Sequence, residues 1–274
     1  MKLDVGCSMT LRALWATPAV LMLRPRSGEG QWVIAERYQI DPSADAIHEF
    51  TDAHGNLCQR IVVPEGSTTI SVEATVDTAD EIEVDVTAPR VPIDEVPDWA
   101  LQFLLPSRYC QSDLVFTNAV EITAGALPGY PQVEAIRSWI AREIRYEYGT
   151  SSPQTSAVDT IYSRAGVCRD FAHLGIALCR SLDIPARMVV GYLHGLDPMD
   201  QHAWFEAYVG GRWFTFDATQ HEPRGNRVTI AYGRDAADVA FVTQFGPVEL
   251  EQMYVYVREA TDLPPVDTGP YDDA

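Results

Sequence analysis

The chain has 274 residues, of which 46% are hydrophobic and 22% are charged, which is typical of a globular protein with room for two domains. Its formal net charge of −19 argues against nucleic acid and against an anionic membrane as partners, because both are bound through basic surfaces. The acidity is most simply a solubility feature, and a weaker interpretation is the steering of basic substrates.

The first residues contain an apolar run at positions 11–23 that Arg12 and Pro18 interrupt, so we expect neither a secretory signal nor a membrane span. Five cysteines without a repeated spacing do not indicate a disulfide framework. A reducing compartment suits such a set, and the sequence therefore predicts a cytoplasmic location.

Residues 1 to about 90 have the pattern of an all-β domain. Short apolar or alternating segments are separated by turn-forming residues, a spacing that is typical of a β-sandwich. We expect strands at residues 3–7, 20–23, 32–40, 57–63, 69–76 and 82–86.

A proline-bearing stretch from Pro89 to Pro106 indicates a linker. We place the boundary near residue 105, so that residues 1–105 form the sandwich domain with its linker and residues 106–258 form a second domain. Residues 259–274 are expected to be a poorly ordered tail.

The second half changes to helical periodicity, with apolar residues spaced three or four apart from Val133 to Ile144. Two more helices are predicted at residues 157–162 and 168–182. Strands are predicted at residues 187–193, 202–209 and 212–217.

Cys168 opens the third of these helices. Unsatisfied backbone N–H groups and the positive end of the helix dipole favour an anion there, such as a thiolate or an oxyanion. Ala172, Gly175 and Cys179 form a stripe of small side chains, from which we infer that the helix packs closely on a sheet. A lone cysteine is more often an inert, small hydrophobic residue. The interpretation of Cys168 as a reactive residue therefore depends on finding a partner base for it.

The partner is supplied by two alternating strands that flank Gly210 and Gly211, a strong hairpin signal. Counting the register from this turn places Trp204 opposite Asp217 and makes His202 and Asp217 diagonal neighbours on one face. A carboxylate in that position can orient the imidazole. For His202 to reach Cys168, the helix that begins at Cys168 must pack on this same face, with the N-terminus of the helix at the His202 end of the hairpin.

At these residues the sequence resembles the transglutaminase-like superfamily. The resemblance rests on three motifs in the order of the family, with a fourth stretch similar to one found downstream in the bacterial branch. The motifs are residues 166–174, 202–206 and 216–219, and the fourth stretch is residues 233–239.

The resemblance implies an α+β fold, in which an N-terminal antiparallel β-sandwich precedes a papain-like core whose cysteine helix packs on an antiparallel sheet. It also implies that Cys168 is the nucleophile, His202 the base and Asp217 the orienting acid. The reaction would be acyl transfer on a peptide or protein substrate through a thioester, without a metal or other cofactor.

The second oxyanion donor stays open, because in parts of the family an upstream Trp or Gln serves. Tyr146, Tyr148 and Gln154 are the upstream polar candidates here, and Trp204 is a further candidate for contact with substrate. Many relatives have proline where Ala218 stands. Asp170 is expected to cap or orient the helix, and His173 to pack structurally.

Within this interpretation we modestly favour hydrolysis over transamidation, because water is always available. A non-catalytic interaction module on the same fold is the main alternative. A three-ligand zinc site of Cys168, His202 and Asp217 is a weaker one, since paired ligand spacings are absent from the sequence. The sequence leaves open whether the protein forms a homo-oligomer.

Overall fold

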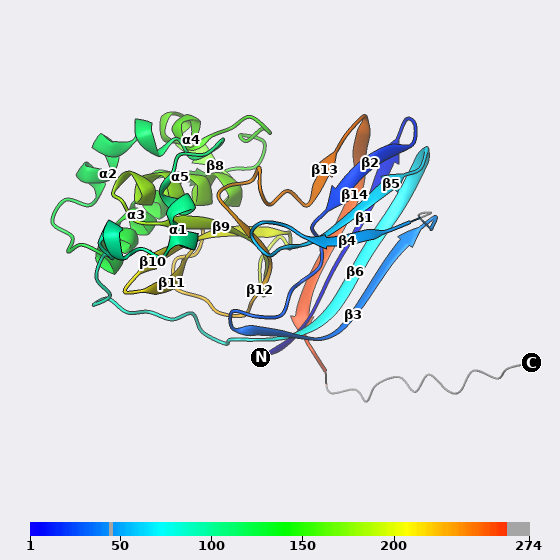
Figure 1. The fold of residues 1–274 in the computed structure, drawn as a ribbon, viewed down its shortest axis with the longest axis horizontal. Coiled ribbons are helices and arrows are strands. Elements are labelled where there is room, and N and C mark those ends of the chain that lie inside the picture. The colour runs from blue at the N-terminus through cyan, green and yellow to red at the C-terminus, as the bar shows by residue number, and fades with distance from the viewer. Residues whose placement is uncertain (44–45, 262–274) are drawn as a thin grey trace, which may run out of the picture.

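The computed structural model describes residues 1–43 and 46–261. One half of the molecule, the sandwich, consists of two four-stranded antiparallel sheets, with strand orders β14-β1-β6-β3 and β13-β2-β5-β4 (Figure 1). The expected fold class, antiparallel sheets followed by a helix-and-sheet core, is confirmed. The strands from the first third of the chain are β1 Lys2–Ala13, β2 Thr17–Leu21, β3 Gln31–Asp41, β4 His48–Thr51, β5 Leu57–Val63 and β6 Gly66–Thr78.

Alternation of side chains explains why these segments form a sandwich. In β1 the apolar residues at every second position, from Leu3 to Leu11, are almost fully buried. The intervening positions carry polar groups that pair across the strands, as where the hydroxyl of Ser8 lies 3.0 Å from that of Ser71 in β6. One face of each strand therefore makes the core and the other stays polar.

The last strands of the chain complete both sheets. β13 (Val242–Gln244) pairs with β2, and β14 (Val248–Glu259) pairs with β1 along almost its whole length. Figure 1 shows both beside the strands from the start of the chain. The boundary near residue 105 stays a prediction, but a linear division at that point does not follow the sheets. Most of the expected tail, residues 262–274, lies outside the described residues.

The strand predicted at residues 82–86 is wrong. These residues belong to an extended connection that follows β6. They cannot form a hairpin with β6, because β6 is already paired with β1 on one side and β3 on the other.

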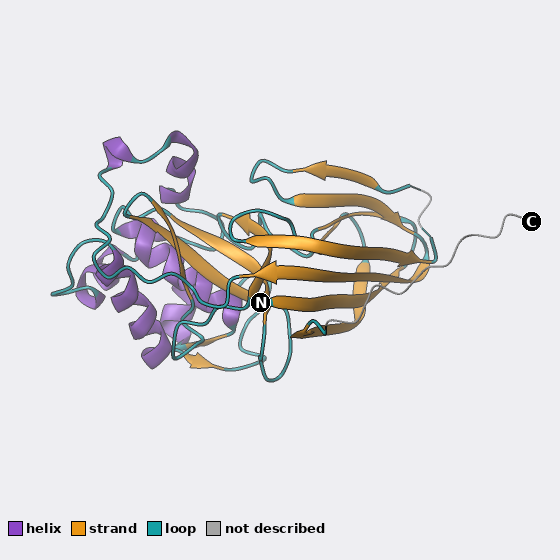
Figure 2. Cartoon of the chain, turned by 90° about the horizontal axis from the view of Figure 1, so that it is seen from below, coloured by secondary structure: helices purple, strands orange, loops and turns teal. Residues whose placement is uncertain are grey.

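The mixed α/β half spans residues 93–233 and contains the predicted helices and hairpin. Its four-stranded sheet has the order β11-β10-β9-β12, and a short parallel pair joins β7 to β8. Figure 2 shows its helices gathered at the end of the molecule away from the long strands of the sandwich. The helices are α1 Asp98–Leu101, α2 Phe116–Ile122, α3 Tyr130–Glu143, α4 Ala157–Ser163 and α5 Cys168–Ser181, with 3₁₀ turns η1 Ile93–Glu95, η2 Gln102–Leu104 and η3 Ser112–Leu114. The strands are β7 Arg145–Tyr146, β8 Ala165–Gly166, β9 Ala186–Leu193, β10 His202–Val209, β11 Arg212–Phe216 and β12 Arg227–Gly233.

Helix α5 is the centre of this half and packs against β10, as the stripe of small side chains predicted. A Cβ atom added at Gly175 would lie 2.4 Å from a ring carbon of Phe205, so only glycine permits this approach. Phe205 faces the helix, whereas Trp204 belongs to a separate apolar cluster with Val189 and Tyr232. The expectation that α5 packs on the face bearing Trp204 is therefore wrong: the helix occupies the opposite face.

The face that bears Trp204 is covered by the sandwich. The side chain of Gln31 accepts from the backbone N–H of Thr229 at 2.7 Å and donates to the carbonyl of the same residue at 2.8 Å. Asn56 pairs in the same way with the backbone of Tyr232, at 2.8 and 2.7 Å. Two amide side chains thus take the place of a neighbouring strand along β12. In the described residues no helix has the length and apolar character needed to cross a membrane.

Candidate active site

Cys168 is the first residue of α5, and its surroundings fix the start of that helix. The buried carboxylate of Asp170 accepts a hydrogen bond from the backbone N–H of Val167 at 2.9 Å, which confirms the expected capping role of Asp170. Gly166 is required beside it, because an added Cβ atom would lie 2.7 Å from the Cβ of Asp170. The first N–H groups of an α-helix have no acceptor within the helix, so that of Cys168 is available to an anion.

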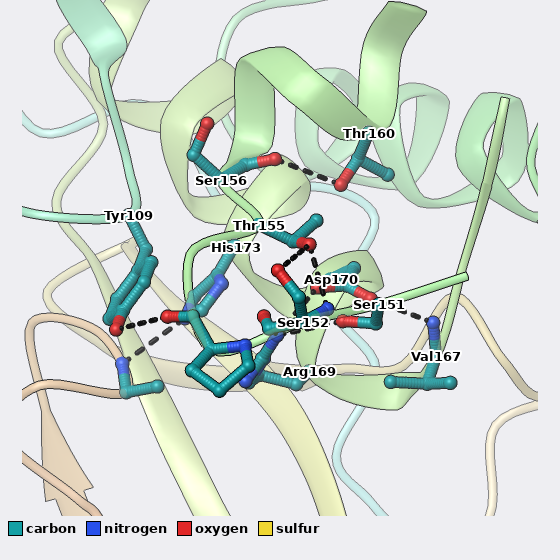
Figure 3. Close-up of polar contacts among 12 residues, drawn as sticks. Tyr109, Ser151, Ser152, Thr155, Ser156, Thr160, Val167, Arg169, Asp170 and His173 are labelled. Atoms are coloured by element: carbon teal, nitrogen blue, oxygen red, sulfur yellow. Dashed lines mark hydrogen bonds and ion pairs between the residues drawn. The ribbon is translucent and has the colours of Figure 1, made fainter. Parts of the chain in front are cut away.

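The loop before α4 is tied to the same helix end. Arg169 donates to the hydroxyl of Ser151 at 2.7 Å and to the carbonyl of Ser152 at 2.5 Å (Figure 3). One turn further, the ring of His173 is stacked on Tyr109, with centroids 5.0 Å apart. Burial lowers the pKa of His173 to about 3, so this imidazole is neutral and serves packing rather than proton transfer.

His202 and Asp217 are brought together by the hairpin in the predicted register, with Phe205 opposite Phe216 and Val209 opposite Arg212. The Nε2 atom of His202 lies 2.7 Å from an oxygen of Asp217. Both side chains are buried. The imidazole is therefore held in one orientation.

The carboxylate of Asp217 has further partners. Its second oxygen accepts from the backbone N–H of Thr219 at 3.0 Å and from the Thr219 hydroxyl at 2.7 Å. The guanidinium of Arg227, at the start of β12, lies 2.9 Å from the oxygen that also meets His202. Sequence reasoning missed Arg227, because one arginine on a strand ten residues later carries no motif of its own.

Opposite charges decide the ionisation of the buried pair. Burial disfavours the imidazolium, but the charge of Asp217 and hydrogen bonds with Asp217 and Cys168 raise the pKa of His202 to about 9. Burial likewise disfavours the carboxylate, yet the charges of His202 and Arg227 hold the pKa of Asp217 well below its usual range. At neutral pH the two groups form an ion pair.

The side chain of Cys168 is close enough to His202 to contribute to the raised pKa of the imidazole. With Nε2 taken by Asp217, Nδ1 is the nitrogen left for the thiol. The five cysteines all lie in the described part of the chain as free thiols, and Cys168 is the partly exposed one of the set. The N-terminus of α5 and the start of β10 thus lie close together.

The upstream candidates separate into two groups. Tyr146 lies in β7, which pairs with β8 so that Tyr146 is opposite Gly166, and its side chain is close enough to Cys168 for the two groups to affect each other's ionisation. Burial and the neighbouring thiol of Cys168 both raise the pKa of Tyr146, which keeps it a hydrogen-bond donor. Tyr148 packs edge-on against Tyr146 at 5.5 Å. Gln154 lies in the exposed loop, where its side chain meets Ser152.

A pocket of about 210 Å³ opens beside His202. Tyr146 and Tyr148 form one wall, and the segment before β10 contributes Asp197 and Asp200. Trp204 does not line this pocket. Its ring stacks on His202 with centroids 6.0 Å apart and lies under the guanidinium of Arg227.

The residues that could hold a metal do not form such a site. In residues 1–43 and 46–261 no three His, Cys, Asp or Glu side chains are arranged to bind an ion. The oxygens of Asp217 are already engaged by His202, Thr219 and Arg227. The arrangement is suited instead to holding a thiol beside a charged imidazole.

Family comparison agrees with this geometry. The model of the transglutaminase-like superfamily core matches residues 117–218, a span that includes Cys168, His202 and Asp217. The model of the bacterial transglutaminase-like N-terminal region matches residues 12–78. The chain belongs to the transglutaminase-like superfamily.

Similar proteins extend the match over most of this transglutaminase-like chain. A crystal structure described as a "putative cysteine protease" from Cytophaga hutchinsonii is 40% identical, covers 97% of this chain and 93% of its own, and superposes with a TM-score of 0.87. An uncharacterized protein of Mycobacterium tuberculosis is 30% identical over 249 residues, which cover 79% of this chain and 77% of the relative. One of Mycobacterium leprae is 29% identical over 235 residues, covering 80% and 82% of the two chains.

Proposed function

We propose that this protein is a cysteine-nucleophile enzyme that transfers the acyl group of an amide or peptide through a thioester. The observation that carries the proposal is the chain of contacts from Cys168 to His202 to Asp217, in which the imidazole is charged at neutral pH. A charged imidazole beside a thiol favours the thiolate, and the thiolate is the nucleophile. Membership of the superfamily and the likeness to the Cytophaga structure support the same reaction class.

The steps follow from the positions of the groups. The thiolate of Cys168 attacks the amide carbonyl carbon, and His202 gives its proton to the leaving amine as the C–N bond breaks. The thioester is then attacked by water or by an amine. His202 takes a proton from this second nucleophile, and the C–S bond breaks to release the acid or the new amide. Asp217 holds the imidazole in place throughout.

Two donors are available for the oxyanion. The backbone N–H of Cys168 lies at the helix start, and the Tyr146 hydroxyl lies beside it. We assign Tyr146 as the second oxyanion donor, with Tyr148 as its support, whereas the side chain of Gln154 is bonded to Ser152 in the exposed loop.

Hydrolysis is the outcome that we favour over transamidation, because the pocket beside His202 is open to water. We propose a peptide or protein as the substrate, and the cytoplasmic location stays a prediction from the sequence.

The first test concerns the nucleophile. Iodoacetamide labelling from pH 5 to 9, mapped by mass spectrometry, is expected to modify Cys168 rapidly below pH 7 and to lose that rate in His202→Ala. Cys179 is the internal control, since burial raises its pKa. Labelling of Cys168 no faster than that of Cys179 would refute the proposal and favour a binding module.

The second test separates the two reactions. A library of peptide amides is incubated with wild type and Cys168→Ala, with and without hydroxylamine as an added amine. Free acid as the main product without hydroxylamine supports hydrolysis. Reaction that occurs only with an added amine would assign the protein as a transamidase, and equal rates in Cys168→Ala would exclude Cys168 as the nucleophile.

A further inference from the structure

The pocket of about 210 Å³ beside His202 combines aromatic rings with acidic groups. The rings belong to Tyr146 and Tyr148, which are 44% and 57% exposed and pack edge to face at 5.5 Å. The acidic groups are the carboxylates of Asp197 and Asp200, in the segment before β10. The proposed mechanism uses neither carboxylate.

Both carboxylates are accessible and lack a basic partner. Asp197 is exposed and makes no hydrogen bond or ion pair with another described residue. Asp200 is partly exposed, and one of its oxygens accepts from the backbone N–H of Gln201 at 2.7 Å. No Lys, Arg or His among the described residues forms an ion pair with Asp200. Each carboxylate is therefore available to a cation that enters the pocket.

The basic groups near the pocket are already engaged. His202 lines the pocket, but its charge is paired with Asp217 at 2.7 Å. Arg224 donates to the side-chain oxygen of Gln220 at 2.8 Å, and Arg137 donates to the backbone carbonyl of the same residue at 3.0 Å. Neither guanidinium lines the pocket. Two unpaired carboxylates and one neutralised cation give a lining that favours a positively charged group.

The position of the pocket decides which part of a substrate enters it. The pocket is lined by His202 but not by Cys168. In the proposed reaction the acyl group is bonded to Cys168, whereas His202 gives its proton to the leaving amine. A pocket on the His202 side therefore receives the residue that carries the leaving amine rather than the acyl group.

We propose that this pocket selects a basic side chain, arginine or lysine, on the residue that supplies the leaving amine. Asp197 and Asp200 pair with its charge, and a cation can also lie over the face of a tyrosine ring. The inference rests on the proposed function, because it assigns the substrate class of that same site. It makes Asp197 and Asp200 determinants of specificity that take no part in bond breaking.

The acyl-enzyme permits a test without the natural acyl group. The ester p-nitrophenyl acetate acetylates Cys168 with release of p-nitrophenolate, and the thioester is then offered equal amounts of argininamide and citrullinamide. The α-amine forms the new C–N bond, its proton passes to His202, and the C–S bond breaks to free the thiolate. Citrullinamide has nearly the same shape without the charge. The guanidinium of arginine stays protonated, so it does not act as a second nucleophile.

Mass spectrometry of the two acetyl amides gives the ratio in which they form, after subtraction of the reaction with Cys168→Ala. We expect about a tenfold excess of acetylargininamide, because two exposed ion pairs and a cation–π contact each contribute a few-fold. Asp197→Asn and Asp200→Asn should each lower the ratio by about two- to threefold. Asp94→Asn is the matched control, since it also removes an exposed carboxylate but lies outside the pocket, and it should keep the wild-type ratio.

Three results would overturn the inference. One is that argininamide gives no more product than citrullinamide. Another is that the ratio is unchanged in both Asp197→Asn and Asp200→Asn. The third is an equal fall in Asp94→Asn, which would trace the preference to the net charge of −19 and not to the pocket.

The proposed function is tested by a different signal in the same experiment. A burst of p-nitrophenolate that Cys168→Ala lacks shows the acyl-enzyme, whichever amide is preferred. If the burst occurs without a preference for argininamide, the inference fails and the proposed function stands. If no burst occurs, both fail together.

Discussion

Asp217→Asn is the substitution that isolates the charge of the orienting carboxylate, because it keeps the size of the side chain and removes the charge. Asp217 is the main reason that the pKa of His202 stands at about 9 and not at the ordinary 6.5. That difference corresponds to about 3 kcal/mol in favour of the imidazolium. Without the charge, burial opposes the imidazolium and only Cys168 still favours it, so the pKa of His202 falls.

The loss carries over to Cys168. At pH 6.5 a neutral imidazole no longer stabilises the thiolate, and a thiol with an ordinary pKa of about 8.5 is only about 1% ionised there. We therefore expect labelling of Cys168 by iodoacetamide to slow by about 100-fold at pH 6.5 in Asp217→Asn. The difference from wild type should shrink as the pH approaches 9, where the thiol ionises without help.

The assay follows the rate of modification of Cys168 by mass spectrometry from pH 5 to 9. Asp238→Asn is the matched control, because Asp238 forms another His–Asp pair, with His54 at 3.3 Å, away from the proposed site. In Asp238→Asn, Cys168 should be labelled at the wild-type rate. If Asp217→Asn also labels within about threefold of wild type at pH 6.5, the charge of Asp217 does not support the thiolate and the electrostatic reasoning fails.

Three further predictions concern stability and pH. Because the pKa of His202 is higher in the folded chain than its ordinary 6.5, its stabilisation is complete below pH 6.5 and is lost as the pH rises through about 9. Urea unfolding should therefore show a fall of about 3 kcal/mol over that range, which His202→Gln should largely abolish; a flat wild-type profile would contradict this. Gly175→Ala should cost about 1–3 kcal/mol in the same assay, because the added methyl group meets the ring of Phe205, and an unchanged midpoint would show that the ring can move. Arg227→Met should destabilise the fold by about 3–5 kcal/mol and shift the labelling profile of Cys168, since it leaves Asp217 buried without its guanidinium. Arg227→Lys should recover part of both effects, and equal losses in the two variants would show that shape and not charge matters at this position.

The hairpin was predictable because its register depends on local chemistry. Gly210 and Gly211 both adopt positive φ angles, of 58° and 83°, which a two-residue turn between antiparallel strands requires. Once the turn is fixed, the alternation of side chains places His202 near Asp217. The cap formed by Asp170 is local in the same sense, since its carboxylate accepts a hydrogen bond from the N–H group of Val167, only three residues away.

The face on which α5 packs was not predictable in this way. All eight residues of β10 are buried, so neither face of the strand is marked as the solvent side. Both faces are covered because the sandwich closes over one of them, through Gln31 and Asn56, and those contacts join residues far apart in the chain. Arg227 was missed for the same reason: its importance comes from tertiary contact with Asp217.

The pairing of β14 with β1 has a consequence for the order in which the protein is made. The α/β half is inserted between β6 and β13, so a ribosome has synthesised the whole of it before the strand that flanks β1 exists. During translation β1 has an open edge, with its backbone groups available to other chains. We expect the α/β half to acquire its structure while the nascent chain is still growing, and the sandwich to close only once β14 has been synthesised. Chains that stop short of residue 248 would keep that edge exposed, and we expect them to aggregate.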